Sequence, residues 1–290
     1  GEYFMANPRI LVVGTVKNVA LVLEREIKRI SELLSPLGSY RIHVVESDST
    51  DGTRKVLDNL NARFDFFTFT SLGNLRDKFP DRIERLIYCR NEYIKEIREN
   101  KEFRLSDFTI VIDLDNKNSL LQTENIKISL NREVDWAGLF ANQGGRYYDI
   151  LALRHPIWSP KSVTEELSWY QNFLSKSVAK EVSIFRRMVK IPKHSSLIPV
   201  ESAFGGFAIY KTSWLLKFNY SRGGVKDQQE DIDHVILNRK IRNSGGLLFI
   251  DPQLLNLKWN SHSLEFYPIY RRNTVWIKRF YALRNRVKSK

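Results

Sequence analysis

Short apolar, β-branched runs alternate with amphipathic stretches through the first part of the chain. The runs predict strands at 9–16, 40–45, 66–70 and 108–112. Between them, apolar residues recur at helical spacing and predict helices at 19–34, 52–60 and 81–99. Strands that alternate with helices are typical of a parallel sheet covered on both faces. We therefore predict an α/β fold with a doubly wound, mostly parallel sheet, which binds ligands beyond the carboxyl ends of its strands.

The pattern becomes less regular in the second half. Strand character returns at 136–140, 203–210 and 247–250, and a helix is predicted at 231–241. Residues 155–198 resemble an insertion or flap rather than a separate domain. We expect one body over 9–264, built from the halves 9–118 and 119–264. Residues 1–8 are expected to be a disordered remnant outside the fold, and residues 265–290 a basic tail.

Charge is distributed unevenly along the chain. There are 46 Lys+Arg against 33 Asp+Glu, a net charge of +13. Eight of the basic residues and no acidic residue lie in 271–290, so the body is only slightly basic. Apolar side chains at helical spacing predict an amphipathic C-terminal helix there: Trp276, Phe280, Leu283 and Val287. Such a helix either binds an anionic membrane surface or packs its apolar stripe on the body, and the sequence leaves both open.

Hydropathy and cysteine content indicate the compartment. With 42% hydrophobic residues the chain is not a disordered basic segment, and no run approaches 18 apolar residues. The first residues lack the charged and apolar regions of a signal peptide. The single cysteine, Cys89, fits a reducing compartment. We expect a cytoplasmic protein, peripheral at the membrane if the tail binds lipid.

Two carboxylates directly follow the most apolar strand of the first half. Asp113 and Asp115 are separated by one residue, so an extended chain points both to the same side. Converging carboxylates need a cation, a proton or a hydroxyl donor. A hard divalent ion that also binds phosphate oxygens suits them. The spacing alone is a weak signal, and its position at a strand end strengthens it.

Two further acidic clusters lie at the ends of predicted elements. Glu46 and Asp48 follow the second strand, where acids can accept hydrogen bonds from a ribose or a base. Their neighbours are turn-forming residues, and the spacing favours a capped turn. Glu230 and Asp231 lead into a helix, whose macrodipole stabilises acids at its start. A carboxylate there can also deprotonate a hydroxyl group.

Glycine, histidine and arginine residues add weaker candidates. Gly205 and Gly206 lie in a strand-like run, which indicates either a β-bulge or the close approach of a sugar to the backbone. His262 is either structural or a metal ligand through a neutral imidazole nitrogen. Arg85 and Arg90 belong to a row of arginines on one predicted helix, which either meets a diphosphate or faces solvent.

Taken in chain order, these elements resemble nucleotide-sugar glycosyltransferases of the GT-A fold, especially family 2. The matching elements are VVESDSTDGT at 44–53, CRN at 89–91, VIDLD at 111–115, the glycine pair 205–206 and the acidic pair 230–231. In the family the acidic pair precedes a helix, and a helix is also predicted after Glu230 and Asp231. The resemblance implies a GT-A fold with a nucleotide-binding first half and an acceptor-side second half.

A second resemblance is to the fungal capsule α-mannosyltransferase family and its bacterial and viral relatives. The stretches that carry it are 82–91, 140–143, 147–150, 230–235 and 248–252. The two resemblances together cover about residues 9–262. This chain departs from the family patterns at three positions, where they have Asp, Asp and Glu: Glu46, Gln143 and Asp233. These departures leave the nucleotide and the donor sugar open.

The resemblance implies a metal-dependent glycosyltransferase. Such an enzyme would move a sugar from a UDP- or GDP-linked donor to a glycan or lipid-linked glycan, as in capsule or cell-surface polysaccharide synthesis. Mn²⁺ or Mg²⁺ would be held by Asp115 and Asp113, with His262 as a third ligand. The residues implied at the nucleotide and donor are Thr15, Glu46, Asp48, Arg85, Arg90, Asp113, Gly205 and Gly206.

The resemblance leaves the stereochemistry open. In an inverting reaction Asp231 would be the general base on the acceptor hydroxyl and Glu230 would orient that acceptor. A retaining reaction needs no such base, and the two acids would position substrates. Family 2 inverts, whereas the fungal mannosyltransferases retain configuration.

Two other classes of function compete with this hypothesis. The net charge is typical of a nucleic-acid-binding protein or nuclease, but the body is only slightly basic and its paired acids repel phosphate unless a metal is bound. A sugar-binding module without catalysis is the other alternative. The presence of Asp113, Asp115 and Asp231 argues against that module. We therefore expect no nucleic-acid partner.

Overall fold

The computed structural model describes residues 7–116, 118–222 and 232–258. In chain order the elements are β1 (Arg9–Val16), α1 (Leu23–Leu34), β2 (Ser39–Glu46), α2 (Thr53–Arg63), β3 (Phe67–Ser71), α3 (Arg82–Glu99), α4 (Lys101–Arg104), β4 (Phe108–Ile112), α5 (Thr123–Leu130), β5 (Gly138–Gln143), α6 (Val163–Tyr170), α7 (Lys176–Ser183), η1 (Phe185–Arg187), β6 (Ile198–Pro199), β7 (Phe207–Lys211), α8 (Thr212–Leu215), α9 (Asp233–Asn243) and β8 (Leu248–Leu257).

The strands form an eight-stranded mixed sheet in the order β3-β2-β1-β4-β7-β5-β8-β6. β1, β2, β3 and β4 pair in parallel, and β5 is parallel to β8. β7 is antiparallel to both β4 and β5, and β6 is antiparallel to β8. The prediction of an α/β fold with a mostly parallel sheet is therefore confirmed.

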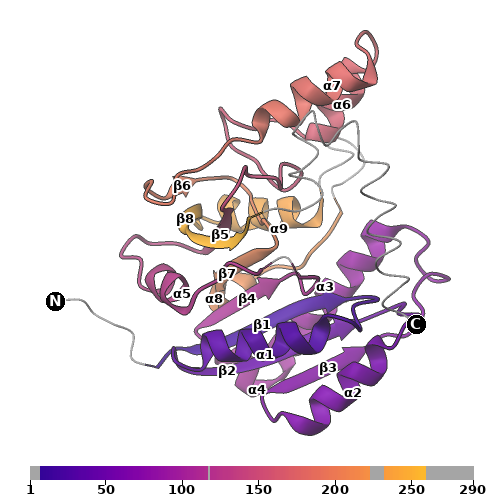
Figure 1. The fold of residues 1–290 in the computed structure, drawn as a ribbon, viewed down its shortest axis with the longest axis vertical. Helices are drawn as coiled ribbons and strands as arrows, with labels where there is room; N and C mark the ends of the chain where they lie inside the picture. Colours follow the sequence, from indigo (N-terminus) through magenta and orange to yellow (C-terminus); the bar gives the residue numbers. More distant parts are fainter. Residues whose placement is uncertain (1–6, 117, 223–231, 259–290) are drawn as a thin grey trace.

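Both faces of the sheet are covered, which explains why the central strands β1 and β4 are mostly apolar and buried. On one face Leu11 of β1 belongs to the same buried cluster as Tyr93 of α3. On the other face Val12 packs in a cluster with Ile27 of α1 and Leu57 of α2. Figure 1 shows α1 and α2 beside the parallel part of the sheet. The helices thus wind onto both faces, as predicted.

Several predicted boundaries agree with the structure and two need correction. The strands predicted at 9–16 and 108–112 coincide with β1 and β4. The strand predicted at 203–210 begins only at Phe207, because Gly205 and Gly206 have φ angles of +71° and +86°, outside the range of a strand. The strand predicted at 247–250 continues to Leu257 as β8, with shifts in its register against β5.

The segment predicted as an insertion or flap folds into short elements. It contains α6, α7 and η1, and β6 begins at its end. Figure 1 shows α6 and α7 projecting from the sheet at the top of the molecule. The division of the chain into domains stays a prediction.

The topology brings several chain segments to one edge of the sheet. β1, β2 and β4 run in the same direction, so the residues after Val16, Glu46 and Ile112 lie at their shared carboxyl edge. β7 runs in the opposite direction and pairs its first residue, Phe207, with Ile112. The glycines that precede β7 are therefore placed beside the acids that follow β4.

Candidate active site at the carboxyl edge of the sheet

Asp113 and the glycine pair meet at this edge. The backbone N–H of Asp113 donates a hydrogen bond of 2.9 Å to the carbonyl of Gly206. A Cβ atom on Gly206 would lie 3.5 Å from Asp113 Oδ2 and 3.4 Å from the Tyr148 hydroxyl. A Cβ atom on Gly205 would lie only 2.6 Å from Gln143 Nε2. Because both glycines have positive φ angles, the turn favours glycine at both positions on conformational grounds, and at Gly205 on steric grounds as well.

Hydrogen bonds fix the glycine turn from both sides. The N–H of Gly205 donates to Asp149 Oδ2 at 2.8 Å. Its carbonyl accepts from Asn256 Nδ2 at 2.7 Å and from the Tyr148 hydroxyl at 3.2 Å. Since Asn256 is fully buried, the bond to its side chain is shielded from water. These hydrogen bonds hold the turn in place beside Asp113, and both of its glycines are buried.

A buried asparagine connects this turn to the loop that carries Asp115. Asn118 Oδ1 accepts a hydrogen bond of 3.0 Å from Asn256 Nδ2. Asn118 Nδ2 in turn donates to the backbone carbonyl of Asp113 at 2.7 Å. The loop after β4 and the turn before β7 are thus parts of one hydrogen-bonded unit.

The edge is electrostatically negative around Tyr148. Burial, followed by the charges of Asp149, Asp113 and Asp115, raises the pKa of Tyr148 well above its usual value. The phenol therefore stays protonated and can donate its hydrogen bond to Gly205. Burial also raises the pKa of Glu26 on α1, against the effect of two arginines, and the charge of Asp115 adds to the rise. An additional positive charge at this edge would relieve the repulsion among these acids.

The donor set fits a divalent cation that is shared with a substrate. Asp113 and Asp115 offer hard carboxylate oxygens at the end of β4. No group of three or more His, Cys, Asp or Glu side chains that could hold a metal occurs among the described residues. Mg²⁺ and similar ions are commonly bound by one or two carboxylates and complete their coordination with phosphate oxygens and water. His262, the predicted third ligand, lies outside the described residues.

The acids at and just after the end of β2, Glu46 and Asp48, accept hydrogen bonds from other groups of the protein. Glu46 is buried, and its two carboxylate oxygens accept from the N–H of Ser49 at 3.0 Å and the hydroxyl of Ser71 at 2.5 Å. Asp48, at φ +56°, accepts from the N–H groups of Leu75 and Arg76. Burial alone would raise the pKa of Asp48, but hydrogen bonds from Leu75, Ser47 and Arg76 lower it below its usual value. These acids shape the loops at the site, as the turn interpretation expected.

Thr15 lies at the same edge, on the neighbouring strand. It is the next-to-last residue of β1 and stands opposite Val45 in the parallel register with β2. Its side chain is partly exposed. The structure thus brings Thr15, Glu46 and Asp113 to the ends of adjacent strands, whereas their contacts with a nucleotide stay a prediction.

The two predicted arginines have protein partners. Arg85 Nη1 donates to the carbonyls of Phe79 and Pro80, and its Nε lies 3.8 Å from Asp48 Oδ2. Arg90 forms an ion pair with Asp233, and both side chains are at most 10% exposed. Arg85 therefore contacts the loops beside Asp48, and Arg90 links α3 to α9, while the contact of either arginine with a diphosphate stays a prediction.

The start of α9 packs directly behind the glycine turn. Asp233 pairs with Arg90, and the ring of His234 stacks on Phe204 with a centroid distance of 3.9 Å. Burial, and then the charge of Arg90, lower the pKa of His234 well below its usual value, so this imidazole is neutral. Phe204 immediately precedes Gly205. Glu230 and Asp231, the predicted acceptor-side acids, lie outside the described residues.

Four residues of this site were not among the predicted candidates. They are Asn118, Tyr148, Asp149 and Asn256. Tyr148 and Asp149 fall in a stretch that matched the capsule mannosyltransferase pattern, so a signal for them existed. Asn118 and Asn256 are single asparagines with no local motif, and only the fold shows that they meet.

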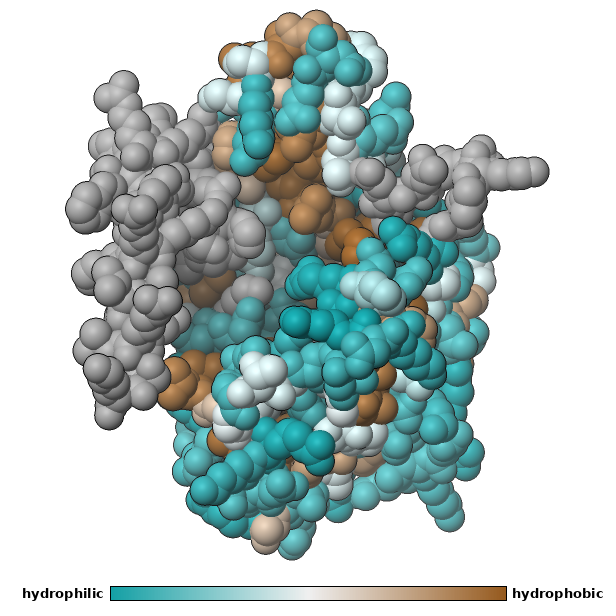
Figure 2. Space-filling model, turned by 90° about the vertical axis from the view of Figure 1, so that its right-hand side faces the viewer, coloured by the Kyte–Doolittle hydropathy of each residue, from teal (hydrophilic) through white to brown (hydrophobic). Residues whose placement is uncertain are grey.

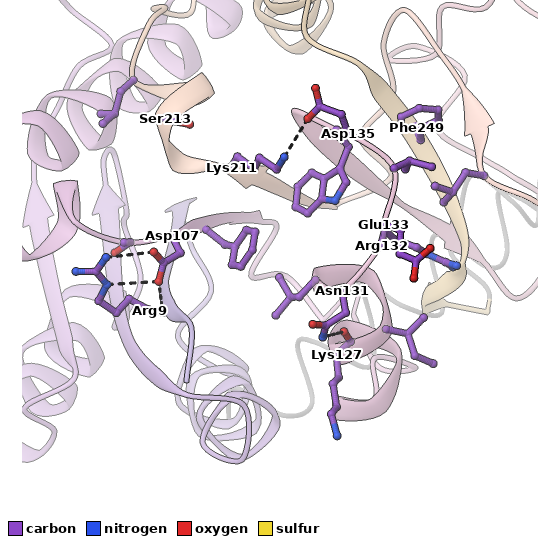
Figure 3. A pocket seen from close by; sticks show the side chains of 18 of the residues that line it. Arg9, Asp107, Lys127, Asn131, Arg132, Glu133, Asp135, Lys211, Ser213 and Phe249 are labelled. Atoms are coloured by element: carbon purple, nitrogen blue, oxygen red, sulfur yellow. Dashed lines mark hydrogen bonds and ion pairs between the residues drawn. The ribbon is translucent and has the colours of Figure 1, made fainter. Parts of the chain in front are cut away.

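A large cavity lies at the opposite edge of the sheet. It has a volume of about 1950 Å³ and is lined by residues at the start of β1 and β4, Arg9 and Phe108 among them. Figure 3 shows that charged side chains in it pair with one another, Arg9 with Asp107 and Lys211 with Asp135, each at 3.1 Å. Its position at the amino ends of the parallel strands argues against it as the donor site.

Comparison with known proteins identifies the fold type. No protein-family model and no curated protein sequence matches the chain. A mannosyltransferase from Pyrobaculum calidifontis, solved with GDP-mannose and Mn²⁺, has a similar structure, with a TM-score of 0.52 at 14% identity over 88% of this chain and 57% of that one. S. aureus TarS residues 1–349 give 0.49 at 10% identity, covering 87% of this chain and 60% of that one.

Glucosyl-3-phosphoglycerate synthase from Mycobacterium tuberculosis, solved with UDP, gives a TM-score of 0.35 at 15% identity over 73% of this chain and 60% of that one. This chain therefore spans 57–60% of the length of these three structures. At sequence identities this low, the similarity shows the fold alone. The sheet order and the likeness to the mannosyltransferase show that this chain has a GT-A type fold.

Proposed function

We propose that this chain is a metal-dependent glycosyltransferase that uses a nucleoside-diphosphate sugar as donor. The observation that carries the proposal is the contact between Asp113 and the glycine turn. A carboxylate at the end of a parallel strand faces a rigid turn at which any side chain would occupy the adjoining space. The GT-A type fold supports this assignment, because ligands of such sheets bind beyond the carboxyl ends of the strands.

In the proposed site, Asp113 and Asp115 hold Mn²⁺ or Mg²⁺ together with the donor diphosphate. When bound, the ion neutralises negative charge on the departing nucleoside diphosphate. The mannosyltransferase of similar fold was solved with GDP-mannose and Mn²⁺, which agrees with a GDP- or UDP-linked donor here. Gly205 and Gly206 leave room for the donor sugar, and Tyr148 keeps their backbone in place.

The nucleotide side of the proposed site is organised by the loops after β1 and β2. Thr15 is proposed to contact the nucleoside directly, whereas Glu46 and Asp48 order the loops around it through the hydrogen bonds described above. Arg85 supports the same loop through Asp48 and two backbone carbonyls. In this proposal Thr15 contacts the donor, and the other three residues fix the loops on which the donor lies.

The acceptor side is assigned to the segment before α9. Arg90, Asp233 and His234 anchor the start of this helix behind the glycine turn. We propose that Asp231 and Glu230, just before this anchor, contact the acceptor, with Asp231 as the base if the reaction inverts configuration. The acceptor class that we propose is a glycan or lipid-linked glycan of a capsule or cell-surface polysaccharide.

A binding titration tests the donor site. The wild-type chain should bind UDP or GDP in the presence of Mn²⁺ and should not bind duplex DNA at this site, because its edge is acidic. Changes to residues outside the metal ligands typically lower metal affinity roughly 10–100-fold. Asp113→Asn and Asp115→Asn change the proposed ligands themselves and should weaken nucleotide binding by more than that. Titration calorimetry with and without chelator measures both effects.

A matched control uses an acid at the far edge of the sheet. Asp135 is paired only with Lys211 among the contacts described here, and its side chain is 85% exposed. Asp135→Asn should leave nucleotide affinity unchanged. Nucleotide binding that is indifferent to Mn²⁺ and to both site variants would contradict the proposal, as would DNA binding that the site variants abolish.

A further inference from the structure

The tip of the molecule carries large apolar side chains that face solvent. α6 and α7 form this tip and lie side by side at the top of Figure 1. Trp169 at the end of α6 and Phe173 in the following turn are each 59% exposed, and Val178 on α7 is also exposed. Figure 2 shows apolar surface gathered at the same end of the molecule. These residues are too exposed to contribute much to the core.

The exposed rings form one compact cluster. Trp169 packs edge to face on Tyr170 and Phe173, with centroid distances of 5.0 and 4.8 Å, and Tyr170 lies 6.0 Å from Phe173. The rings are therefore held in place by one another before any partner binds. Interplanar angles of 64–85° present ring edges and corners rather than a single flat face.

The tip carries a net positive charge. From 167 to 180 there are two lysines, Lys176 and Lys180, and no acidic residue. Over 161–193 there are seven Lys or Arg and three Glu. One of those glutamates, Glu166, is ion-paired with buried Arg187. The solvent-facing tip is therefore apolar and basic.

More apolar surface lies at the base of the two helices. Ile157 and Val189 are both exposed. Their segments adjoin, since Trp158 Nε1 donates a hydrogen bond of 2.7 Å to the carbonyl of Arg187. Lys190 follows Val189 and is exposed as well. The combination of aromatic, aliphatic and basic side chains thus continues from the tip toward the body.

We propose that the α6–α7 tip, residues 161–193, binds to the surface of an anionic lipid bilayer. Trp and Tyr are suited to the membrane interface, because the ring is apolar and its N–H or O–H reaches water. Nearby lysines add attraction to acidic headgroups. Insertion would place the rings of Trp169 and Phe173 among the acyl chains. The ammonium groups of Lys176 and Lys180 would then lie at the lipid phosphates.

Two other occupants of this surface fit less well. A sugar ring stacks on a flat aromatic face and takes hydrogen bonds from acids and amides, whereas this cluster presents edges flanked by lysines. A second copy of the chain would bring its own basic tip against this one. No helix among the described segments is both long and apolar enough to cross a bilayer. The structure therefore assigns this surface to peripheral contact with lipid, independently of the donor site.

Vesicle flotation of the full chain tests this inference. Wild-type protein should float with phosphatidylserine-containing vesicles, less at high salt, and only weakly with pure phosphatidylcholine. Replacing both lysines in Lys176→Gln/Lys180→Gln should weaken binding about 25-fold, since each basic residue near an anionic surface contributes about fivefold. Trp169→Ala/Phe173→Ala should weaken it at least about tenfold, because apolar burial in the interface is lost.

Matched controls lie on and just after α4, at the other end of the molecule in Figure 1 and away from the donor site. Lys101→Gln/Arg104→Gln removes two exposed charges there, and Leu105→Ala removes an apolar side chain that is 46% exposed. These variants should float like wild type. All variants should keep the wild-type unfolding temperature and nucleotide affinity, so that failure of this inference is separate from failure of the donor site.

Three results would overturn the inference. Wild-type protein that does not float with anionic vesicles is one, and tip variants that float like wild type are another, since a different surface would then make the contact. The third is that the aromatic variant retains flotation but loses oligosaccharide binding or self-association. That result would assign the cluster to a glycan or to a second copy of the chain.

Discussion

At Gly205 and Gly206 the backbone adopts positive φ angles next to a carboxylate. A Cβ atom on Gly205 would lie too close to Gln143, whereas a Cβ atom on Gly206 would be in ordinary contact with the Tyr148 hydroxyl and Asp113 Oδ2. Gly205 is therefore required on conformational and steric grounds, and Gly206 on conformational grounds. We infer that the absence of a side chain at Gly206 also keeps the space beside Asp113 open for the donor sugar.

Substitution of Gly206 tests this inference. Gly206→Ala places a Cβ at φ +86°, which should cost roughly 1–2 kcal/mol of stability and should also block the space beside Asp113. We expect donor turnover to fall by at least roughly tenfold, because the added methyl group would displace the donor from its reactive position. Turnover of nucleotide sugar and urea unfolding measure the two effects separately.

Gly245 supplies the control for strain alone. It has a similar φ angle of +91°, and an added Cβ there would have no heavy atom within 4 Å. Gly245→Ala should lose a comparable amount of stability and keep its donor turnover. If both variants lose turnover equally, or neither does, Gly206 has no special relation to the donor.

A buried histidine in β2 should make stability depend on pH. Burial lowers the pKa of His43 from 6.5 to about 4, and its Nδ1 is 2.9 Å from Thr68 Oγ1. Between these two pH values the unfolded chain binds a proton that the folded chain does not. Stability is thus fully present above pH 6.5 and falls by about 3 kcal/mol as the pH decreases to 4.

His43→Gln should remove this contribution, so that its unfolding free energy depends less on pH than that of wild type between pH 6.5 and 4. The same replacement at exposed His194 controls for the loss of a histidine from the unfolded chain. Urea unfolding at several pH values provides the measurement. Parallel pH profiles for wild type and His43→Gln would refute the assignment.

At the residue level the sequence predicted the acids and glycines but not their partners. Asp113 was placed at the end of a predicted strand, whereas Gly205 and Gly206 were predicted inside one, and only the family resemblance grouped the three residues. Asn118 and Asn256 meet across 138 positions of sequence, and no local pattern indicates such a pair. Glu46 and Asp48 were correctly placed at a strand end. Their hydrogen-bond donors, however, belong to loops whose course the sequence does not specify.

At the level of elements, the parallel strands were predictable because their apolar runs are short and bounded by turn residues. The errors lie where backbone geometry overrides hydrophobicity. The apolar residues before Phe207 continue the strand pattern, yet two positive φ angles end it. β8 was predicted too short, because Pro252 suggests a strand end, whereas a register shift against β5 accommodates it.

The ion pair between α3 and α9 should be a strong link between elements. Arg90 and Asp233 are both nearly buried, so removing one partner leaves the other charged and desolvated. Arg90→Met or Asp233→Asn should therefore cost about 3–5 kcal/mol. The double variant should be more stable than the sum of the two changes predicts, because it leaves no unpaired charge.

An exposed pair on the same fold provides the comparison. Arg41 and Glu102 lie 2.7 Å apart with 40% and 58% of their side chains exposed. Arg41→Met should cost less than about 1 kcal/mol. Equal costs for Arg90→Met and Arg41→Met in urea unfolding would show that burial does not strengthen the link.

At the level of the whole molecule, the net charge divides among regions with different properties. The carboxyl edge of the sheet is acidic, as expected for a site that takes a metal ion, while the α6–α7 tip is basic and apolar. The predicted basic tail, 271–290, lies outside the described residues and stays a prediction. The α6–α7 tip is a second basic region. The sequence did not indicate it, because its residues were predicted to belong to an irregular insertion.

The topology explains why one edge serves the proposed chemistry. Parallel strands β1, β2 and β4 deliver Thr15, Glu46 and Asp113 to the same side, and antiparallel β7 starts there with its glycine turn. The cavity at the other edge contains the ion pairs of Arg9 with Asp107 and Lys211 with Asp135. The proposed site is therefore chosen by strand direction and not by the presence of this cavity.

The central claim is that Asp113 and Asp115 support metal-dependent cleavage of a nucleotide sugar. It is tested most directly by measuring UDP or GDP released from a panel of UDP- and GDP-sugars. With Mn²⁺, wild-type protein should release nucleotide from one donor class, and chelator should stop the release. Asp113→Asn/Asp115→Asn should lower the rate by more than about 100-fold, beyond the losses typical of changes outside the metal's own ligands. Release that continues in the double variant with chelator present would contradict the account.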